Sequence, residues 1–130
     1  MRKLDEITGE ILAAAYRIHT GMGPGLLESV YEAVLAKLLT ERGFDVERQK
    51  IVPIVFEGLH FDEGFRVDML VDGRVVVELK SVEKVAPVHA TQLLTYLRLM
   101  DARVGLLINF GAPTLKQAVT RVVNLYVPGA

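Results

Sequence analysis

The chain has 130 residues, of which 51% are hydrophobic and 24% charged, and its formal net charge is −1. We expect a single domain over residues 1–130 with a core of ordinary size, in a cytoplasmic protein without a membrane span. The lack of cysteine excludes disulfide bonds and thiolate metal sites. The near-zero charge argues against a protein that coats nucleic acid through bulk electrostatics, but it does not exclude a nuclease with local phosphate contacts.

Two helices are predicted in the first third of the chain. Apolar side chains recur at helical spacing over residues 5–19, and the glycine-rich segment 21–25 ends this helix. A second helix is predicted from Leu26 to Arg42, with Gly43 as its C-terminal stop. Residues 44–57 are expected to be extended, although Pro53 limits strand pairing there.

The segment from residue 65 to 80 predicts a β-hairpin that turns near Asp72-Gly73. A two-residue turn would pair residue 68 with 77 and would put Asp68 and Glu78 on opposite faces. A three-residue loop over 71–73 pairs 70 with 74 and 66 with 78, and only this register separates apolar from charged side chains. We therefore predict an apolar face of Phe65, Val67, Met69, Val75, Val77 and Leu79, and a second face of Arg66, Asp68, Leu70, Val76, Glu78 and Lys80.

The C-terminal third predicts one more helix and a buried strand. Pro87 suits the first turn of a helix over about residues 88–101. The continuous apolar run from Val104 to Ile108 is typical of a strand buried on both faces. Residues 115–123 fit a helix or a strand. Two helices, β-hairpins, a helix and a strand, in that order, predict an α/β fold with a mixed sheet flanked by helices.

The charged face of the hairpin carries the candidate chemistry. Asp68, Glu78 and Lys80 would bring two carboxylates and an ammonium to one point, where they can hold a divalent metal and a water beside a phosphate. Lys80 would then stabilise developing negative charge rather than act as a base. The alternative interpretation is a solvated sheet face, because charged residues are mostly exposed.

Other candidates lie on the predicted helices. Glu28 stands in a first helical turn, where a negative charge is favourable, so a capping carboxylate and a metal ligand are both consistent with its position. Gln92 and Tyr96 lie one turn apart and share a helix face. Their alternatives are a surface glutamine and a packing tyrosine. His89, at the start of the same helix, would face the site or only support the helix start.

Together these residues resemble the PD-(D/E)xK nuclease superfamily and, more narrowly, the bacterial GxxExxY family of small nucleases. The segment from Gly25 to Tyr31 carries the GxxExxY motif, Asp68 matches the first core acid, and residues 78–80 match ExK. The segment from Gln92 to Tyr96 resembles the QxxxY motif of the RecB-type branch. The resemblance covers roughly residues 5–125 and implies a restriction-endonuclease-like core.

The resemblance implies a metal-dependent nuclease that hydrolyses phosphodiester bonds, with DNA favoured over RNA as substrate. The small size of the chain suggests that a partner or a homodimer supplies substrate selection. Mg²⁺ or Mn²⁺ would be held by the two carboxylates, the Leu79 carbonyl and, through an outer position, Glu28. Substrate contacts would come from Gln92, Tyr96, His89 and Arg66. Two alternatives remain open: a non-catalytic nucleic-acid-binding module, and a homo-oligomeric interaction module whose charged cluster is a salt-bridge network.

Overall fold

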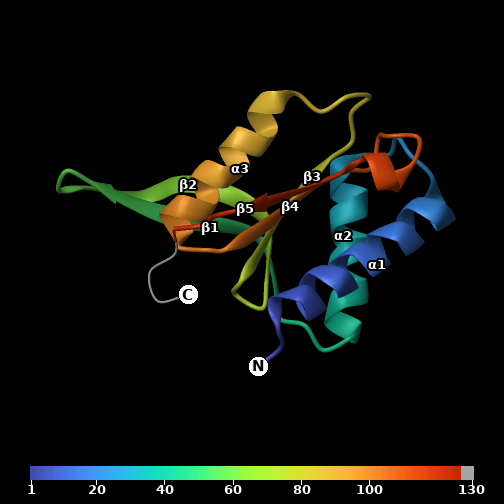
Figure 1. The fold of residues 1–130 in the computed structure, drawn as a ribbon, viewed down its shortest axis with the longest axis horizontal. Helices are drawn as coiled ribbons and strands as arrows, with labels where there is room; N and C mark the ends of the chain where they lie inside the picture. Colours follow the sequence, from blue (N-terminus) through green and yellow to red (C-terminus); the bar gives the residue numbers. More distant parts are fainter. Residues whose placement is uncertain (127–130) are drawn as a thin grey trace.

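Five strands form one mixed sheet in the computed structural model, which describes residues 1–126 (Figure 1). The strands are adjacent in chain order, and only the β3–β4 pair is parallel. The elements are α1 (Leu4–Met22), α2 (Glu28–Glu41), β1 (Val46–Phe56), β2 (Leu59–Val71), β3 (Val75–Lys80), α3 (Pro87–Met100), β4 (Val104–Asn109), a 3-10 turn (Leu115–Gln117) and β5 (Val119–Val123). The expected α/β fold with a mixed, helix-flanked sheet is confirmed.

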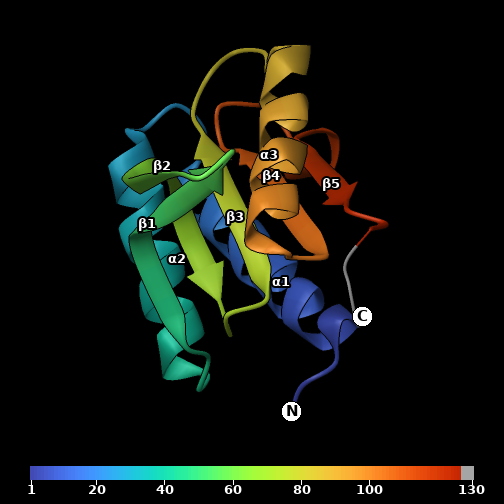
Figure 2. The same ribbon diagram turned by 90° about the vertical axis from the view of Figure 1, so that its left-hand side faces the viewer.

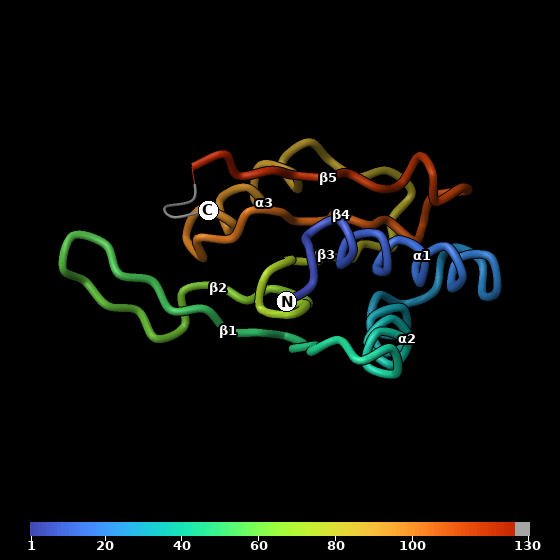
Figure 3. The backbone as a smooth tube through the Cα atoms, turned by 60° about the horizontal axis from the view of Figure 1, so that its bottom comes forward, coloured from blue at the N-terminus to red at the C-terminus, as the bar shows by residue number. Residues whose placement is uncertain are grey.

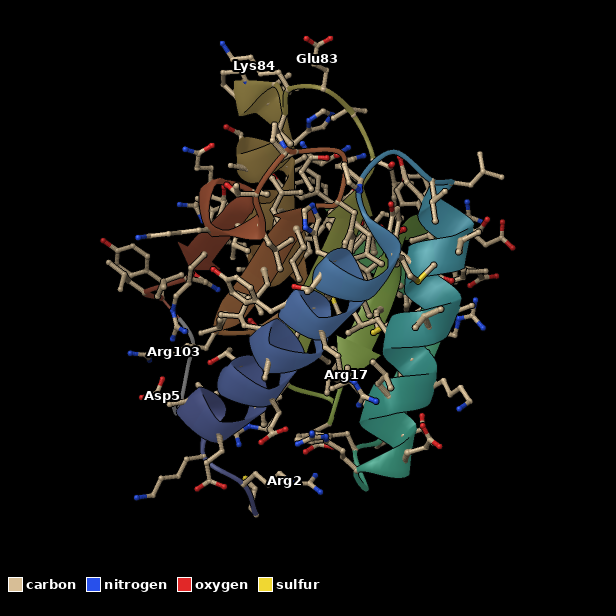
Figure 4. The ribbon with its side chains drawn as sticks, turned by 90° about the vertical axis from the view of Figure 1, so that its right-hand side faces the viewer. Arg2, Asp5, Arg17, Glu83, Lys84 and Arg103 are labelled. Carbon is tan, nitrogen blue, oxygen red and sulfur yellow. The ribbon has the colours of Figure 1, made fainter. Side chains whose placement is uncertain are left out.

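The helices cover opposite faces of the sheet. Figure 2 shows α3 in front of the strands and α1 and α2 behind them. Figure 4 looks onto α1 and α2, with Arg2 at one end of this layer and Glu83 and Lys84 on the β3–α3 loop at the other. Each face has its own core. The α1/α2 core includes Ile7, Ile11, Tyr31, Leu35, Met69, Val77, Leu79, Leu106 and Phe110, and the α3 core includes Val67, Leu70, Val76, Leu93, Leu97 and Leu107.

The element bounds agree with the prediction at most positions. Gly43 has a φ of 90° and follows the last turn of α2, as expected of a C-terminal stop. Pro87 is in the first turn of α3, and every residue of β4 is buried. Residues 115–123, left open between helix and strand, form a 3-10 turn followed by a strand. No helix within residues 1–126 is long and apolar enough to cross a membrane.

The predicted pairing register of the β2–β3 hairpin is wrong by two residues. Val71 pairs with Val75 and Leu70 with Val76, so the loop is 72–74 rather than 71–73. Asp72 and Gly73 both have positive φ, 52° and 64°, so the turn begins one residue later than expected. The Asp45 N–H and the Arg2 guanidinium bond to the Asp72 carboxylate at 2.9 and 2.7 Å. Burial opposes the ionised form, yet these partners lower the pKa of Asp72.

The predicted division of the hairpin into two faces is correct for β3 and partly wrong for β2. A shift of two residues preserves the alternation, so Met69, Val77 and Leu79 do lie in the α1/α2 core. Val67 packs in the α3 core instead, and Phe65 stacks on Tyr96 of α3 with ring centroids 4.4 Å apart. The alternation of β2 therefore breaks between Val67 and Met69, where Asp68 stands.

The prediction did not anticipate that β2 begins at Leu59 and that β1 and β2 project from the sheet as a long arm (Figure 3). The arm turns at Glu57 and Gly58, both of which have positive φ. Its register shifts between Val52 and Ile54, on either side of Pro53, which confirms that this proline limits pairing.

Candidate active site

Strands β2 and β3 separate where the candidate acids lie. Their regular pairing ends at Met69 and Val77, and the residues beyond Val77 pair only with β4. The Leu79 N–H, which points toward β2, donates to Asp68 Oδ2 at 2.8 Å instead of to a backbone carbonyl. Because β2 and β3 no longer pair here, the Asp68 side chain takes the place of a strand partner. Its hydrogen bond from Leu79 fixes the carboxylate against the backbone of the ExK segment.

The Glu78 carboxyl lies beside Asp68 in a mostly desolvated position. Burial raises the pKa of Glu78 to about 9, contact with the Asp68 carboxylate adds to the rise, and the Asp68 backbone amide and Lys80 partly oppose it. Residues of α3 pack over this side of the hairpin. Glu78 therefore does not lie on a fully solvated sheet face. Carboxyls whose pKa is displaced by burial and by a second acid are typical of functional sites.

Lys80 and Tyr96 adjoin this acid pair from two elements. Lys80 is close enough to Glu78 to favour its ionised form. Tyr96 is half-buried under the start of the arm, and its pKa is raised by burial and by the charges of Glu78 and Asp68. Tyr96 stacks on Phe65, so it has the packing role that was the alternative to a substrate contact. Its hydroxyl is nevertheless within electrostatic range of both acids.

The glycine-rich turn before α2 is fixed by the tyrosine of the GxxExxY segment. The buried Tyr31 hydroxyl donates to the Gly23 carbonyl at 2.6 Å and accepts from the Leu26 N–H at 3.0 Å. The ring stacks on Phe110, with centroids 4.3 Å apart. The Ser81 hydroxyl, one residue after Lys80, donates to the Leu26 carbonyl. The turn that precedes Glu28 is therefore joined directly to the end of β3.

The remaining candidates are less closely gathered. Glu28 is the first residue of α2 and is exposed, as are Gln92 and Arg66. His89 is half-buried, and its Nδ1 accepts from the Ala86 N–H at 3.2 Å, which gives it a role at the start of α3. The structure thus brings Asp68, Glu78, Lys80 and Tyr96 together. It does not show contacts between this group and the side chains of Glu28, Arg66, His89 and Gln92.

One supporting residue was missed from the sequence. The buried Asn109 side chain exchanges two hydrogen bonds with the Val82 backbone, at 2.9 and 3.0 Å, and the Phe110 N–H donates to the Lys80 carbonyl at 2.8 Å. These contacts hold the chain just beyond the ExK segment. An amide at the end of an apolar strand was the available signal, because such a residue needs hydrogen-bond partners when it is buried.

The side chains at the site fit a hard divalent cation. Glu78 Oε1 is buried and receives no hydrogen bond within residues 1–126, so one carboxylate oxygen lacks a partner. Asp68 supplies a second carboxylate at the same place. Oxygen donors of this kind are what Mg²⁺ and Mn²⁺ prefer, and Mg²⁺ commonly takes only one or two carboxylates. Within the described part of the chain no three acidic or histidine side chains converge, so Glu28 does not join the pair as a third ligand here.

Comparison with known proteins agrees with this geometry. A family model described as the PD-(D/E)XK nuclease superfamily matches residues 5–122, which is nearly the whole chain and includes every residue discussed above as a member of the site. No curated protein matches the chain significantly.

Proposed function

Because the chain belongs to the PD-(D/E)XK nuclease superfamily, we propose that it is a divalent-metal-dependent nuclease that cleaves nucleic acid, DNA in preference to RNA. The observation that carries this proposal is the partly buried Glu78 carboxyl beside Asp68, at the point where β2 and β3 separate. A purely structural sheet face has no need of a desolvated carboxyl next to a second acid, because placing two like charges together away from water is costly.

We assign Asp68 and Glu78 as the carboxylate ligands of Mg²⁺ or Mn²⁺, with the Leu79 carbonyl as a backbone ligand by family resemblance. Such a metal, when bound, polarises a phosphoryl oxygen and lowers the pKa of a bound water. The Leu79 N–H orients Asp68 by donating to its Oδ2, and Oδ1 is assigned as the metal ligand. Lys80 contributes a positive charge that stabilises negative charge developing on the phosphate.

The outer residues take supporting roles in the proposal. The turn before Glu28 is fixed by Tyr31 and joined to the end of β3 by Ser81, and Glu28 is assigned an outer position that acts through a water. Gln92, His89 and Arg66 are on or next to the elements that flank the acid pair and are assigned to the nucleic-acid backbone. Tyr96 is also assigned to the nucleic-acid backbone, which it would contact through its hydroxyl because its ring is held by Phe65.

Three finer assignments belong to this proposal. The segment from Gly25 to Tyr31 supports membership of the GxxExxY family, because its tyrosine fixes the turn that precedes its glutamate. Residues 1–130 are treated as one nuclease-like domain. A homodimer is the assembly assigned to the protein in this proposal. The cytoplasmic location remains a prediction from the sequence.

The proposal is tested by cleavage assays on labelled duplex DNA, single-stranded DNA and RNA with Mg²⁺ or Mn²⁺. We expect cleavage by the native chain, and a loss of about 100-fold or more for Asp68→Asn and for Lys80→Met, the magnitude typical of removing one charge-stabilising group. Asp62→Asn is the matched control, because it removes an exposed carboxylate from the same strand. No cleavage of any substrate, or cleavage that survives Asp68→Asn, would overturn the proposal.

A further inference from the structure

The pairing of β1 with β2 is interrupted at the level of Asp68. Arg48 pairs with Met69 and Lys50 with Val67, but the residues between them, Gln49 and Asp68, form no pair. Gln49 has a φ of 50°, in the left-handed region that residues with a side chain rarely adopt outside turns. An isolated left-handed residue in mid-strand therefore faces the first acid of the candidate site.

Both strands change the face that they present at this level. Residues two apart in a regular strand share a face, yet Met69 lies in the α1/α2 core and Val67 in the α3 core. In β1, Lys50 forms an ion pair with Glu47 at 2.9 Å, although residues three apart in a regular strand point to opposite sides. The backbone of each strand is thus rotated between these pairs of residues, at Gln49 and at Asp68.

Glu32 of α2 holds the rotated segment of β1. Its side chain is buried, its Oε1 accepts from the Gln49 amide, and its Oε2 accepts from Arg48 Nε at 3.0 Å and forms an ion pair with Arg48 Nη2, also at 3.0 Å. A buried carboxylate that accepts from a guanidinium and an amide makes charge-assisted, directional hydrogen bonds. These bonds tie the side chain of the left-handed residue to a helix and oppose its return to an extended conformation.

We propose that Glu32 is a positioning residue for the candidate active site. It holds Gln49 in the left-handed conformation, the kinked β1 leaves Asp68 without a strand partner, and the rotated β2 turns the Asp68 carboxylate toward the Leu79 N–H and Glu78. Glu32 therefore acts on the metal site from the opposite side of the sheet, without contact with metal or substrate. The consequence for metal binding rests on the proposed function, whereas the consequence for Asp68 does not.

A simple ion pair between α2 and β1 is the competing explanation, and two substitutions at the exposed Gln49 distinguish it. Gln49→Gly and Gln49→Val both remove the amide that bonds to Glu32, but only glycine adopts a positive φ freely and valine resists it strongly. If the kink positions Asp68, the two variants differ at the site. If only the Glu32 bonds matter, the two variants behave alike.

The experiment compares the native chain with Gln49→Gly, Gln49→Val, Glu32→Ala and the double variant Glu32→Ala/Gln49→Gly. Two readouts are used: the amide proton and nitrogen shifts of Leu79 without metal, and Mn²⁺ affinity by calorimetry. Glu41→Ala is the matched control, since it removes the carboxylate of an exposed ion pair on the same helix. The Gln49 pair keeps the test valid if Glu32→Ala fails to fold.

We expect Gln49→Gly to keep the Leu79 shifts and to bind Mn²⁺ within about threefold of the native chain, and Gln49→Val and Glu32→Ala to move the shifts and weaken Mn²⁺ binding by about tenfold or more, as for other residues that orient ligands. The double variant should recover most of the affinity lost in Glu32→Ala. Equal behaviour of the glycine and valine variants, or native Leu79 shifts in folded Glu32→Ala, would overturn the proposal. Failure of the native chain to bind Mn²⁺ would count against the nuclease assignment alone, because the Leu79 shifts need no metal.

Discussion

The two faces of the sheet are built from the same strands but carry different kinds of side chain. The face under α1 and α2 is filled by a large core in which the strand residues are apolar and enclosed. The face under α3 has a smaller core that ends at Asp68, Glu78 and Tyr96. The α1/α2 face therefore holds the larger apolar core, and the α3 face combines a smaller core with Glu78 and Tyr96, whose charged forms are disfavoured. Truncation in the α1/α2 core and neutralisation of Glu78 should change stability with opposite signs.

The largest effect is expected in the α1/α2 core. Leu35→Ala removes a fully enclosed side chain and should lower the free energy of unfolding by about 3 kcal/mol, from lost transfer free energy and the cavity left behind. Urea denaturation measures this loss. Leu99→Ala, on the exposed side of α3, is the matched control and should cost far less. Similar losses for both would show that the α1/α2 layer is not the stabilising one.

An effect of opposite sign is expected at Glu78. Its folded pKa, about 9, lies above its ordinary value of 4.5, so the stabilising contribution of the protonated carboxyl is complete below pH 4.5 and is lost as the pH rises toward 9. Glu78→Gln avoids that loss. In EDTA the variant should be clearly more stable than the native chain at pH 8, with little difference at pH 4.5, because only the native chain loses the contribution of the protonated carboxyl as the pH rises.

Thermal unfolding across this pH range measures the difference. Glu63→Gln, in the exposed arm, is the control and should show no comparable trend with pH. A variant no more stable than the native chain at pH 8 would mean that Glu78 is well solvated, and the contrast between the two faces would fail at its main point.

A smaller effect is expected where the α1/α2 core meets the site. Tyr31→Phe keeps the ring on Phe110 but removes the hydroxyl that bonds to Gly23 and Leu26, at a cost of about 1 kcal/mol. Because the turn before Glu28 is released, hydrogen exchange at the Leu26 amide should accelerate more than the loss of global stability explains. Unchanged local exchange would contradict the role given to this tyrosine.

The smallest effect is expected at the exposed pair of Lys37 and Glu41. Lys37→Ala should change the free energy of unfolding by about 0.5 kcal/mol or less, since solvent screens an i,i+4 pair on a helix surface. The same denaturation curves measure this change. A larger loss would show that charges on the helix surface, and not apolar burial alone, stabilise the α1/α2 layer.

The sequence predicted which residues of β3 share a face better than it predicted the pairing register of the hairpin. Periodicity identified the helices and the buried β4, and alternation put Glu78 and Lys80 on one face of β3 because that property survives a shift of two residues. The turn itself was misplaced, because the left-handed conformation of Asp72 depends on contacts with Arg2 and Asp45 that are distant in sequence.

The rotation at Gln49 and Asp68 left no signal in the local pattern. Glutamine has no preference for a left-handed backbone, and the carboxylate that holds it comes from α2, seventeen residues earlier. The long arm was similarly hidden, although Gly58 and Gly64 were available as signals of a turn and of a close approach. Glycine is required at position 64 because the Ile54 side chain lies directly over its backbone, where any larger residue would collide.

Calorimetric titration of Mn²⁺ and Mg²⁺ into the native chain, Asp68→Asn and Asp62→Asn decides whether the acid pair is a metal site. We expect a saturable metal site in the native chain and in Asp62→Asn, and none in Asp68→Asn, because Asp68, unlike the exposed Asp62, lies beside Glu78. Equal binding by all three proteins would contradict the site. So would an absence of binding by the native chain, both alone and with a deoxynucleoside monophosphate supplying a phosphate.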